Sequence, residues 1–257
     1  VGNSDLTVSE AARLYQNPVG LIQSLAGEIQ NQTKNEQTVF DLVFAGDLFD
    51  IGAGSVGLAV GGQYRRDELS SDSDKTSNDF NYKFVFGQPD FEGSLTTYAA
   101  FAEVLVPVTD WMEVTVAGRY EKFDEINVDT FDPKITLLAQ PVDSLSLRAS
   151  YGTSFRVGSL LQLFGNQTSL LNSTDPFSGT GGLAFRPSLT DGNSELQPEE
   201  AKAFNLVLSY IPQEGALAGF SFNVDYYNYD YDDIITRQSH QALIDADNVS
   251  RCPGGVN

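Results

Sequence analysis

Eight segments of this chain alternate apolar and polar residues, and this alternation constrains the fold more than any other feature. The clearest segment places Phe220, Phe222, Val224 and Tyr226 at every second position, with mostly hydrophilic residues between them. Successive side chains of a β-strand point to opposite faces of the sheet, so a period of two predicts strands with one apolar and one polar face. The chain is therefore predicted to be all-β.

The length of the segments and the connectors between them narrow this prediction. The strands are predicted at 37–46, 55–65, 94–106, 111–122, 130–140, 144–154, 199–211 and 219–231. Most have about 10 to 13 residues, whereas soluble strands typically have about 5–6 and a tilted bilayer-spanning strand needs roughly 9–11. Short turns follow every odd strand and longer connectors every even one, as in barrels with short periplasmic turns and long extracellular loops. We predict an antiparallel up-and-down transmembrane β-barrel fragment.

The remaining segments are predicted to be loops. Residues 1–36 form an extracellular segment with two short helices, because Thr7 and Glu10 have capping-box spacing and Asn17-Pro18 is typical of a second helix start. The barrel part, 37–257, carries long loops at 66–93, 155–198 and 232–257. The aromatic residues near the end of the first loop could form a hairpin above the sheet.

A soluble β-sandwich is the alternative for alternating strands, but its strands are shorter and its two ends do not differ systematically. In a barrel, five charged residues of the strands point into a wet lumen, whereas in a sandwich they belong to the solvated face. These residues are Glu103, Glu113, Arg119, Lys134 and Arg148.

Aromatic residues gather near both predicted ends of the strands, as in the two aromatic belts of membrane barrels. Toward the long loops lie Tyr64, Tyr120, Tyr151, Tyr226, Tyr227, Tyr229 and Tyr231. Toward the short turns lie Phe49, Trp111, Tyr210 and Phe220. Ordinary strand propensity of aromatic residues is the competing explanation.

Composition excludes several classes of protein. The net charge of −20 argues against a nucleic-acid partner, because phosphate binding requires Lys and Arg. There is no apolar run of about 18 residues that would form a transmembrane helix. The single cysteine, Cys252, is either a free thiol or pairs with a cysteine beyond this chain. Without a leader pattern at Val1, the sequence is expected to be an internal piece of a longer protein.

No pattern of catalytic residues is recognised, and we expect neither an enzyme nor a cofactor. The only histidine, His240, cannot form a histidine metal cluster and is expected to be an exposed loop residue. The acidic groups Asp72 with Asp74, and Asp230 with Asp232 and Asp233, are either solvated loop charges or calcium ligands. We assign no metal site.

Two arginines are candidate ligand-binding residues. Arg156 and Arg186 lie in or beside the longest loop, where a guanidinium would grip an anionic ligand bidentately.

Four strings occur in the order found in TonB-dependent outer-membrane receptors, and together they resemble that family. They are GDLFD at 46–50 with VGLAVGGQYRRDE at 56–68, YGTSFRVGSL at 151–160, GNSELQPEEA at 192–201, and VDYY at 224–227 with DDII at 232–235. Val157-Gly158 stands where the family usually has Ala-Pro. In this family the arginine at position 156 more often has a structural role.

The resemblance implies a middle part of a barrel of about 22 strands in the outer membrane of a Gram-negative bacterium. It implies contact with outer-membrane lipid and active uptake of a scarce small molecule such as a siderophore, cobalamin or glycan. TonB would energise uptake through a plug and TonB box that precede residue 1. A passive porin-like barrel and a soluble β-rich binding module are the alternatives.

Overall fold

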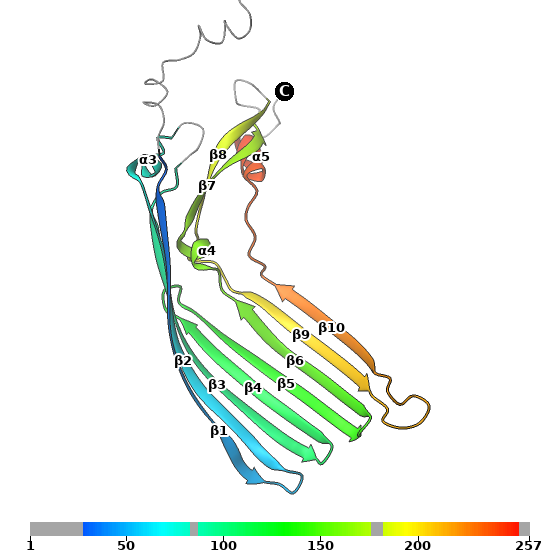
Figure 1. Ribbon diagram of the computed structural model, residues 1–257. Helices are drawn as coiled ribbons and strands as arrows, with labels where there is room; N and C mark the ends of the chain where they lie inside the picture. Colours follow the sequence, from blue (N-terminus) through cyan, green and yellow to red (C-terminus); the bar gives the residue numbers. More distant parts are fainter. Residues whose placement is uncertain (1–27, 83–86, 176–181, 252–257) are drawn as a thin grey trace, which may run out of the picture.

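The computed structural model describes residues 28–82, 87–175 and 182–251. Eight strands form one antiparallel sheet in the order β1-β2-β3-β4-β5-β6-β9-β10, and β7 and β8 form a separate hairpin (Figure 1). The strands of the sheet are β1 (Asn31–Asp50), β2 (Ser55–Ser73), β3 (Phe91–Thr109), β4 (Met112–Phe123), β5 (Val128–Val142), β6 (Leu145–Arg156), β9 (Glu199–Tyr210) and β10 (Phe222–Asp232). Each strand pairs with its neighbour along the chain, except that β6 pairs with β9 across the hairpin. This up-and-down order is the one predicted.

One face of the sheet is apolar, and its side chains are exposed. The strand register aligns Phe44 with Val60 and Ala102, and Val104 with Val116, along neighbouring rows. Leu42, Phe44, Val116, Ile135 and Val224 on this face all have large exposed surfaces. A wide, continuous exposed apolar surface marks contact with a partner or a membrane. We call it the apolar face.

Aromatic rows border the apolar face at both ends. Phe40, Tyr64 and Tyr98 lie in register, with ring centroids 6.2 and 5.5 Å apart. At the other end Tyr210 stacks on Phe222 at 6.4 Å. On β3 the apolar positions run from residue 98 to residue 106, about 27 Å along a strand that rises ~3.4 Å per residue. Tilted by about 35–45°, a segment of this length spans roughly 19–22 Å along the membrane normal, which is most of an apolar band about 25 Å tall.

The opposite face is polar, and we call it the polar face. The register places all five charged residues predicted for the lumen on this face: Glu103, Glu113, Arg119, Lys134 and Arg148. Gln63 donates to Asp41 at 2.6 Å and accepts from Arg119 at 2.9 Å. The strands therefore carry a hydrogen-bonded polar lining behind their apolar face.

Several strands extend further than predicted. β1 begins at Asn31 and β2 continues to Ser73, so most of the polar stretches 30–37 and 66–73 are paired strand. The first long connector is correspondingly 74–90 rather than 66–93. The alternation of apolar and polar residues ends where the apolar face ends, but backbone pairing does not depend on side-chain polarity. That is why the sequence pattern marked the strand ends too early.

The connectors also depart from the predicted rhythm. The connector between β4 and β5 has four residues, 124–127, whereas the one between β9 and β10 has eleven, 211–221.

The predicted short helices of 1–36 and the partner of Cys252 lie outside the described residues. So do residues 83–86 of the expected hairpin, and the described residues 79–82 are not strand.

Four short elements extend the connectors at one end of the sheet. They are α3 (Lys75–Asn78), α4 (Leu160–Phe164), the hairpin of β7 (Asn166–Thr174) and β8 (Leu183–Asp191), and α5 (His240–Arg251). The predicted loops 155–198 and 232–257 therefore contain regular structure. Figure 1 shows the hairpin rising beyond the sheet with α5 beside it and α4 at its base. No helix of the described ranges has the length and hydropathy of a membrane span.

Candidate ligand-binding site

The site begins with α4, which folds onto the polar face. Ser159 caps this helix, and Gln162 completes a capping box by accepting from the Ser159 backbone N–H at 2.9 Å. A five-residue helix is not stable alone, so tertiary contacts must hold it. Leu163, 2% exposed, packs against the buried side chains of Leu95 and Phe123 at the ends of β3 and β4. This small core fixes where the long connector leaves the sheet.

Close backbone packing holds α4 from both sides. A Cβ at Gly192 would lie 2.7 Å from the backbone of Leu163, and one at Gly93 would lie 2.5 Å from the ring of Phe164. Gly192 N–H donates to Gly165 O at 2.6 Å and Asn193 N–H to Gln162 O at 2.8 Å. Two glycines are therefore required because the connector lies directly on the helix and the helix on β3.

An ion pair joins the two ends of this connector. Arg156 at the end of β6 donates through Nε and Nη2 to both carboxylate oxygens of Glu199 at the start of β9, at 2.6 and 2.7 Å. Arg156 Nη1 also donates to Gln162 Oε1 at 3.3 Å, and Ile235 N–H donates to Glu199 Oε1 at 2.8 Å. The Arg156–Glu199 ion pair thus connects β6, β9, α4 and the segment after β10.

The electrostatic effect on Glu199 is large. The hydrogen bonds from Arg156, together with the backbone N–H of Ile235, lower the pKa of Glu199 to about 2 from its ordinary value of 4.5. Hydrogen bonds to the charged form of a carboxyl group stabilise that form. Glu199 is therefore ionised throughout the neutral and mildly acidic range, and its contacts persist there.

The β7–β8 hairpin and α5 form the outer part of the site. Gln241 binds the edge of β7, accepting from Thr174 N–H at 2.9 Å and donating to Thr174 O at 2.9 Å. The ring Nε2 of His240 lies 2.7 Å from Asn172 O. Arg237 Nη2 donates to Gln167 Oε1 at 3.1 Å. These bonds attach the segment after β10 to the hairpin.

A cavity of about 440 Å³ lies between these elements. We call it the loop cavity. Its wall combines leucines with hydroxyl and amide side chains, from α4, from both strands of the hairpin, from 235–238 and from α5. The volume falls within the roughly 300–1,000 Å³ range of small-molecule sites, which are largely apolar with a few placed polar groups.

Comparison with models of known protein families shows which family this chain belongs to. The model of the family described as "TonB dependent receptor-like, beta-barrel" matches residues 3–251. The chain belongs to this family. The apolar face and its aromatic rows are therefore the lipid-facing wall of a TonB-dependent receptor barrel, and the polar face lines the lumen.

Solved receptors share the fold. A mutant of the ferric enterobactin receptor PfeA from Pseudomonas aeruginosa is similar with a TM-score of 0.57 and 16% identity, over 78% of this chain and 27% of that one. The siderophore receptor PirA from Acinetobacter baumannii is similar with a TM-score of 0.55 and 13% identity, over 79% and 28%. The RagAB peptide transporter has a TM-score of 0.52 and 14% identity, over 80% and 24%. This chain thus spans about a quarter of the length of each of these proteins, and the open eight-stranded sheet is a part of a barrel.

Two of the family strings meet in space through one ion pair. Arg156 belongs to the string at 151–160 and Glu199 to the string at 192–201, and the two residues are paired in register on β6 and β9. The pair closes the base of a 42-residue insertion, 157–198, in a barrel wall that otherwise runs between sequential neighbours. The strings therefore mark the place where the receptor attaches its largest described loop.

The two predicted ligand-binding arginines lie on different sheets. Arg156 is bound to Glu199 at the end of β6, and its side chain is 51% exposed. Arg186 lies on β8 with Nη2 3.8 Å from Asp175. Their binding of a ligand stays a prediction, and each would have to bind it in competition with a carboxylate.

The sequence did not indicate the residues that line the loop cavity from 188–190 and 236–238. The hairpin itself had a signal, because Leu183, Phe185 and Leu189 alternate in β8 in the same way as in the wall strands. Residues 236–238 had none, since they lie beside the hairpin only through tertiary contacts.

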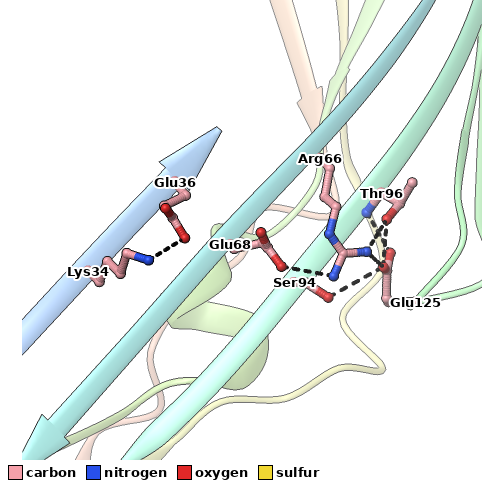
Figure 2. A network of polar contacts seen from close by, with 7 residues as sticks. All are labelled: Lys34, Glu36, Arg66, Glu68, Ser94, Thr96 and Glu125. Atoms are coloured by element: carbon pink, nitrogen blue, oxygen red, sulfur yellow. Dashed lines mark hydrogen bonds and ion pairs between the residues drawn. The ribbon is translucent and has the colours of Figure 1, made fainter. Parts of the chain in front are cut away.

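A second polar cluster lies just beyond the aromatic row on the apolar face (Figure 2). Arg66 donates to Glu68 at 2.9 Å and to Thr96 Oγ1 at 3.3 Å. Glu125 accepts from Thr96 N–H at 2.6 Å and from the Thr96 hydroxyl at 2.8 Å. Burial opposes ionisation of Glu125, but the hydrogen bonds from Thr96 outweigh it and lower its pKa. This abrupt change from tyrosines to charges marks the outer boundary of the lipid-facing band.

One residue of each acidic group considered as calcium ligands is engaged elsewhere. Asp74 caps α3 by accepting from Thr76 and Ser77 N–H, and Asp232 pairs with Lys202 at 3.1 Å. Within the described ranges no three His, Cys, Asp or Glu side chains lie close enough together to hold a metal ion.

Proposed function

We propose that the protein containing this chain is an outer-membrane receptor that takes up a scarce small molecule with energy from TonB. The observation that carries the proposal is the match of a receptor barrel family to residues 3–251. An exposed apolar face between two aromatic rows, and a polar face behind it, support a position in the outer membrane with lipid outside and an aqueous lumen inside.

The chain supplies part of the wall and part of the external binding surface in this proposal. β1 and β10 are the two edges of the sheet, and strands from the rest of the protein would pair with them. The connectors carrying α4, the hairpin and α5 would meet the ligand first, because binding residues concentrate on loops held by a rigid scaffold. Coupling to TonB would come from the part of the protein outside this chain.

The test uses the full-length gene. Three strains are compared: the wild type, a receptor deletion and a strain lacking TonB. For each strain, growth on candidate ligands and the accumulation of these ligands are measured. Uptake that needs both the receptor and TonB supports the proposal. Uptake that needs the receptor but continues without TonB would identify a passive porin-like barrel instead.

A further inference from the structure

We infer that the loop cavity binds an uncharged ligand rich in hydroxyl or amide groups rather than a polyanionic metal chelate. This inference rests on the proposed uptake function, whose ligand class it specifies. It follows from the charges and hydrogen-bonding groups of the described loops.

Four hydrogen-bonding side chains of the cavity wall are uncharged and unoccupied. The side chains of Ser188, Thr190, Thr236 and Gln238 line the cavity and make no hydrogen bond within the described part of the chain. Hydroxyl and amide groups both donate and accept. They match ligand groups that also do both, namely sugar hydroxyls and peptide amides. A polyanion offers mainly acceptors, so these groups could only donate to it and their accepting oxygen atoms would be left without a partner.

The apolar part of the wall suits the same ligand. Leu161 of α4, Leu189 of β8 and Leu243 of α5 face the cavity from three elements. Contact with CH groups of a neutral ligand would remove these side chains from water, at roughly 25 cal/mol per Å² of apolar surface. A strongly hydrated anion would gain nothing from them.

The charges of the wall are balanced. Its carboxylate is Asp191 and its guanidinium is Arg237, which already donates to Gln167. An anion-binding site uses several Arg or Lys side chains with free donors. The loop cavity therefore lacks the surplus of positive charge that a polyanion needs.

The arginines of the insertion, of its base and of α5 are also paired with acids. Arg156 is bound to Glu199, Arg186 lies by Asp175, and Arg251 is bound to Asp247 at 2.8 Å. Recruiting any of them to an anionic ligand would leave a carboxylate unpaired beside that ligand. Like charges at such a site disfavour binding.

The neighbouring cavities are acidic. The one at the Arg66 cluster has four carboxylates, Glu36, Glu68, Glu92 and Glu125, against Lys34 and Arg66. The one between β5 and β6 has three, Asp129, Asp132 and Glu200, against Lys202. The excess of carboxylates in these two cavities repels anions and leaves neutral ligands unaffected.

The test is calorimetric titration of the purified full-length receptor in detergent. The probes are maltotetraose for hydroxyl groups, an end-blocked tetra-alanine peptide for amide groups, and ferric enterobactin for the polyanion. We expect binding of an uncharged probe and none of ferric enterobactin. Which uncharged probe binds distinguishes a sugar from a peptide as the source of the chemistry.

Variants assign the binding to the loop cavity. Gln238→Ala and Thr190→Val should each weaken the bound uncharged probe roughly 3- to 10-fold, the value of one hydrogen bond. Gln213→Ala is the matched control, because Gln213 lies in the β9–β10 turn and donates to Ile211 O. It should leave the affinity unchanged.

Three results would overturn the inference: ferric enterobactin binds, no uncharged probe binds, or both cavity variants bind as the wild type does. The proposed function is judged separately by uptake in the strain lacking TonB. TonB-dependent uptake of ferric enterobactin would overturn the ligand class alone. Binding of an uncharged probe without TonB-dependent uptake would overturn the function and leave the cavity assignment in place.

Discussion

Replacing Leu163 with alanine should release α4 from the barrel wall without unfolding the barrel. Leu163 is 2% exposed, and its packing partners Leu95 and Phe123 are 4% and 1% exposed. The substitution removes apolar contacts and leaves a cavity, and changes of this kind cost about 2–5 kcal/mol. A value of about 3 kcal/mol corresponds to a roughly 150-fold increase in local opening. The five-residue helix cannot offset this loss by itself.

Hydrogen exchange of the full-length receptor in detergent measures this opening directly. Peptides covering 157–165 and 192–198 should lose protection in Leu163→Ala, while peptides of β3 and β4 below the site keep theirs. Leu161→Ala is the matched control, since Leu161 is on the same helix but 44% exposed. It should change exchange by less than about 5-fold, because exposed positions contribute little to stability. Equal exchange in the two variants, or loss of protection throughout the wall, would refute the reasoning.

Three further predictions concern the ion pair, a glycine and the lipid-facing wall. The contribution of Glu199 should be complete above pH 4.5 and be lost as the pH falls toward its folded-state pKa of about 2. The protection factors of 235–238, which correct for the pH dependence of intrinsic amide exchange, should therefore fall in this window for the wild type and be low and pH-independent in Glu199→Gln. Gly61→Ala should destabilise the barrel by about 1–3 kcal/mol and lower the yield of folded protein on heat-modifiability gels, because the added Cβ would lie 2.8 Å from Leu42 O. Gly62→Ala, whose Cβ would lie 3.5 Å from Ala99 O, should fold normally. Ala102→Arg, at the middle of the lipid-facing segment 98–106, should cost about 2–4 kcal/mol in urea unfolding from lipid vesicles. Glu103→Arg on the lumen side should cost less than about 1 kcal/mol, and equal costs would mean that the two faces are assigned wrongly.

The part of the fold that the sequence predicted is the part that meets the lipid. A bilayer requires apolar side chains at every second position, so segments such as 98–106 show the alternation and their faces were assigned correctly. Above the aromatic row this requirement ends. Residues 66–73 still pair with β1, but their Arg, Asp, Glu and Ser side chains are typical of a loop.

The candidate site was not predictable to the same extent. The sequence indicated Arg156 and Arg186 because they are isolated cations in a long loop, but not the carboxylates that bind them. Glu199 is 43 residues from Arg156, and Gln167 is 70 residues from Arg237. Such contacts depend on how the β6–β9 connector folds back on the wall. No periodic pattern of residues in the sequence predicts how this connector folds back.

The pairing of β6 with β9 separates the requirements of the wall from those of the site. The two strands are in register from Leu145↔Tyr210 to Arg156↔Glu199, so both ends of the 42-residue insertion are held side by side by the sheet and by one ion pair. Residues inside the insertion can therefore change to suit a ligand without altering the register of the barrel. The fold common to the enterobactin receptor and the peptide transporter accordingly carries no information about ligand class. That information lies in the charges and hydrogen-bonding groups of the insertion and of 235–238, where this chain presents hydroxyls and amides, pairs Arg186 with Asp175 and bonds Arg237 to Gln167.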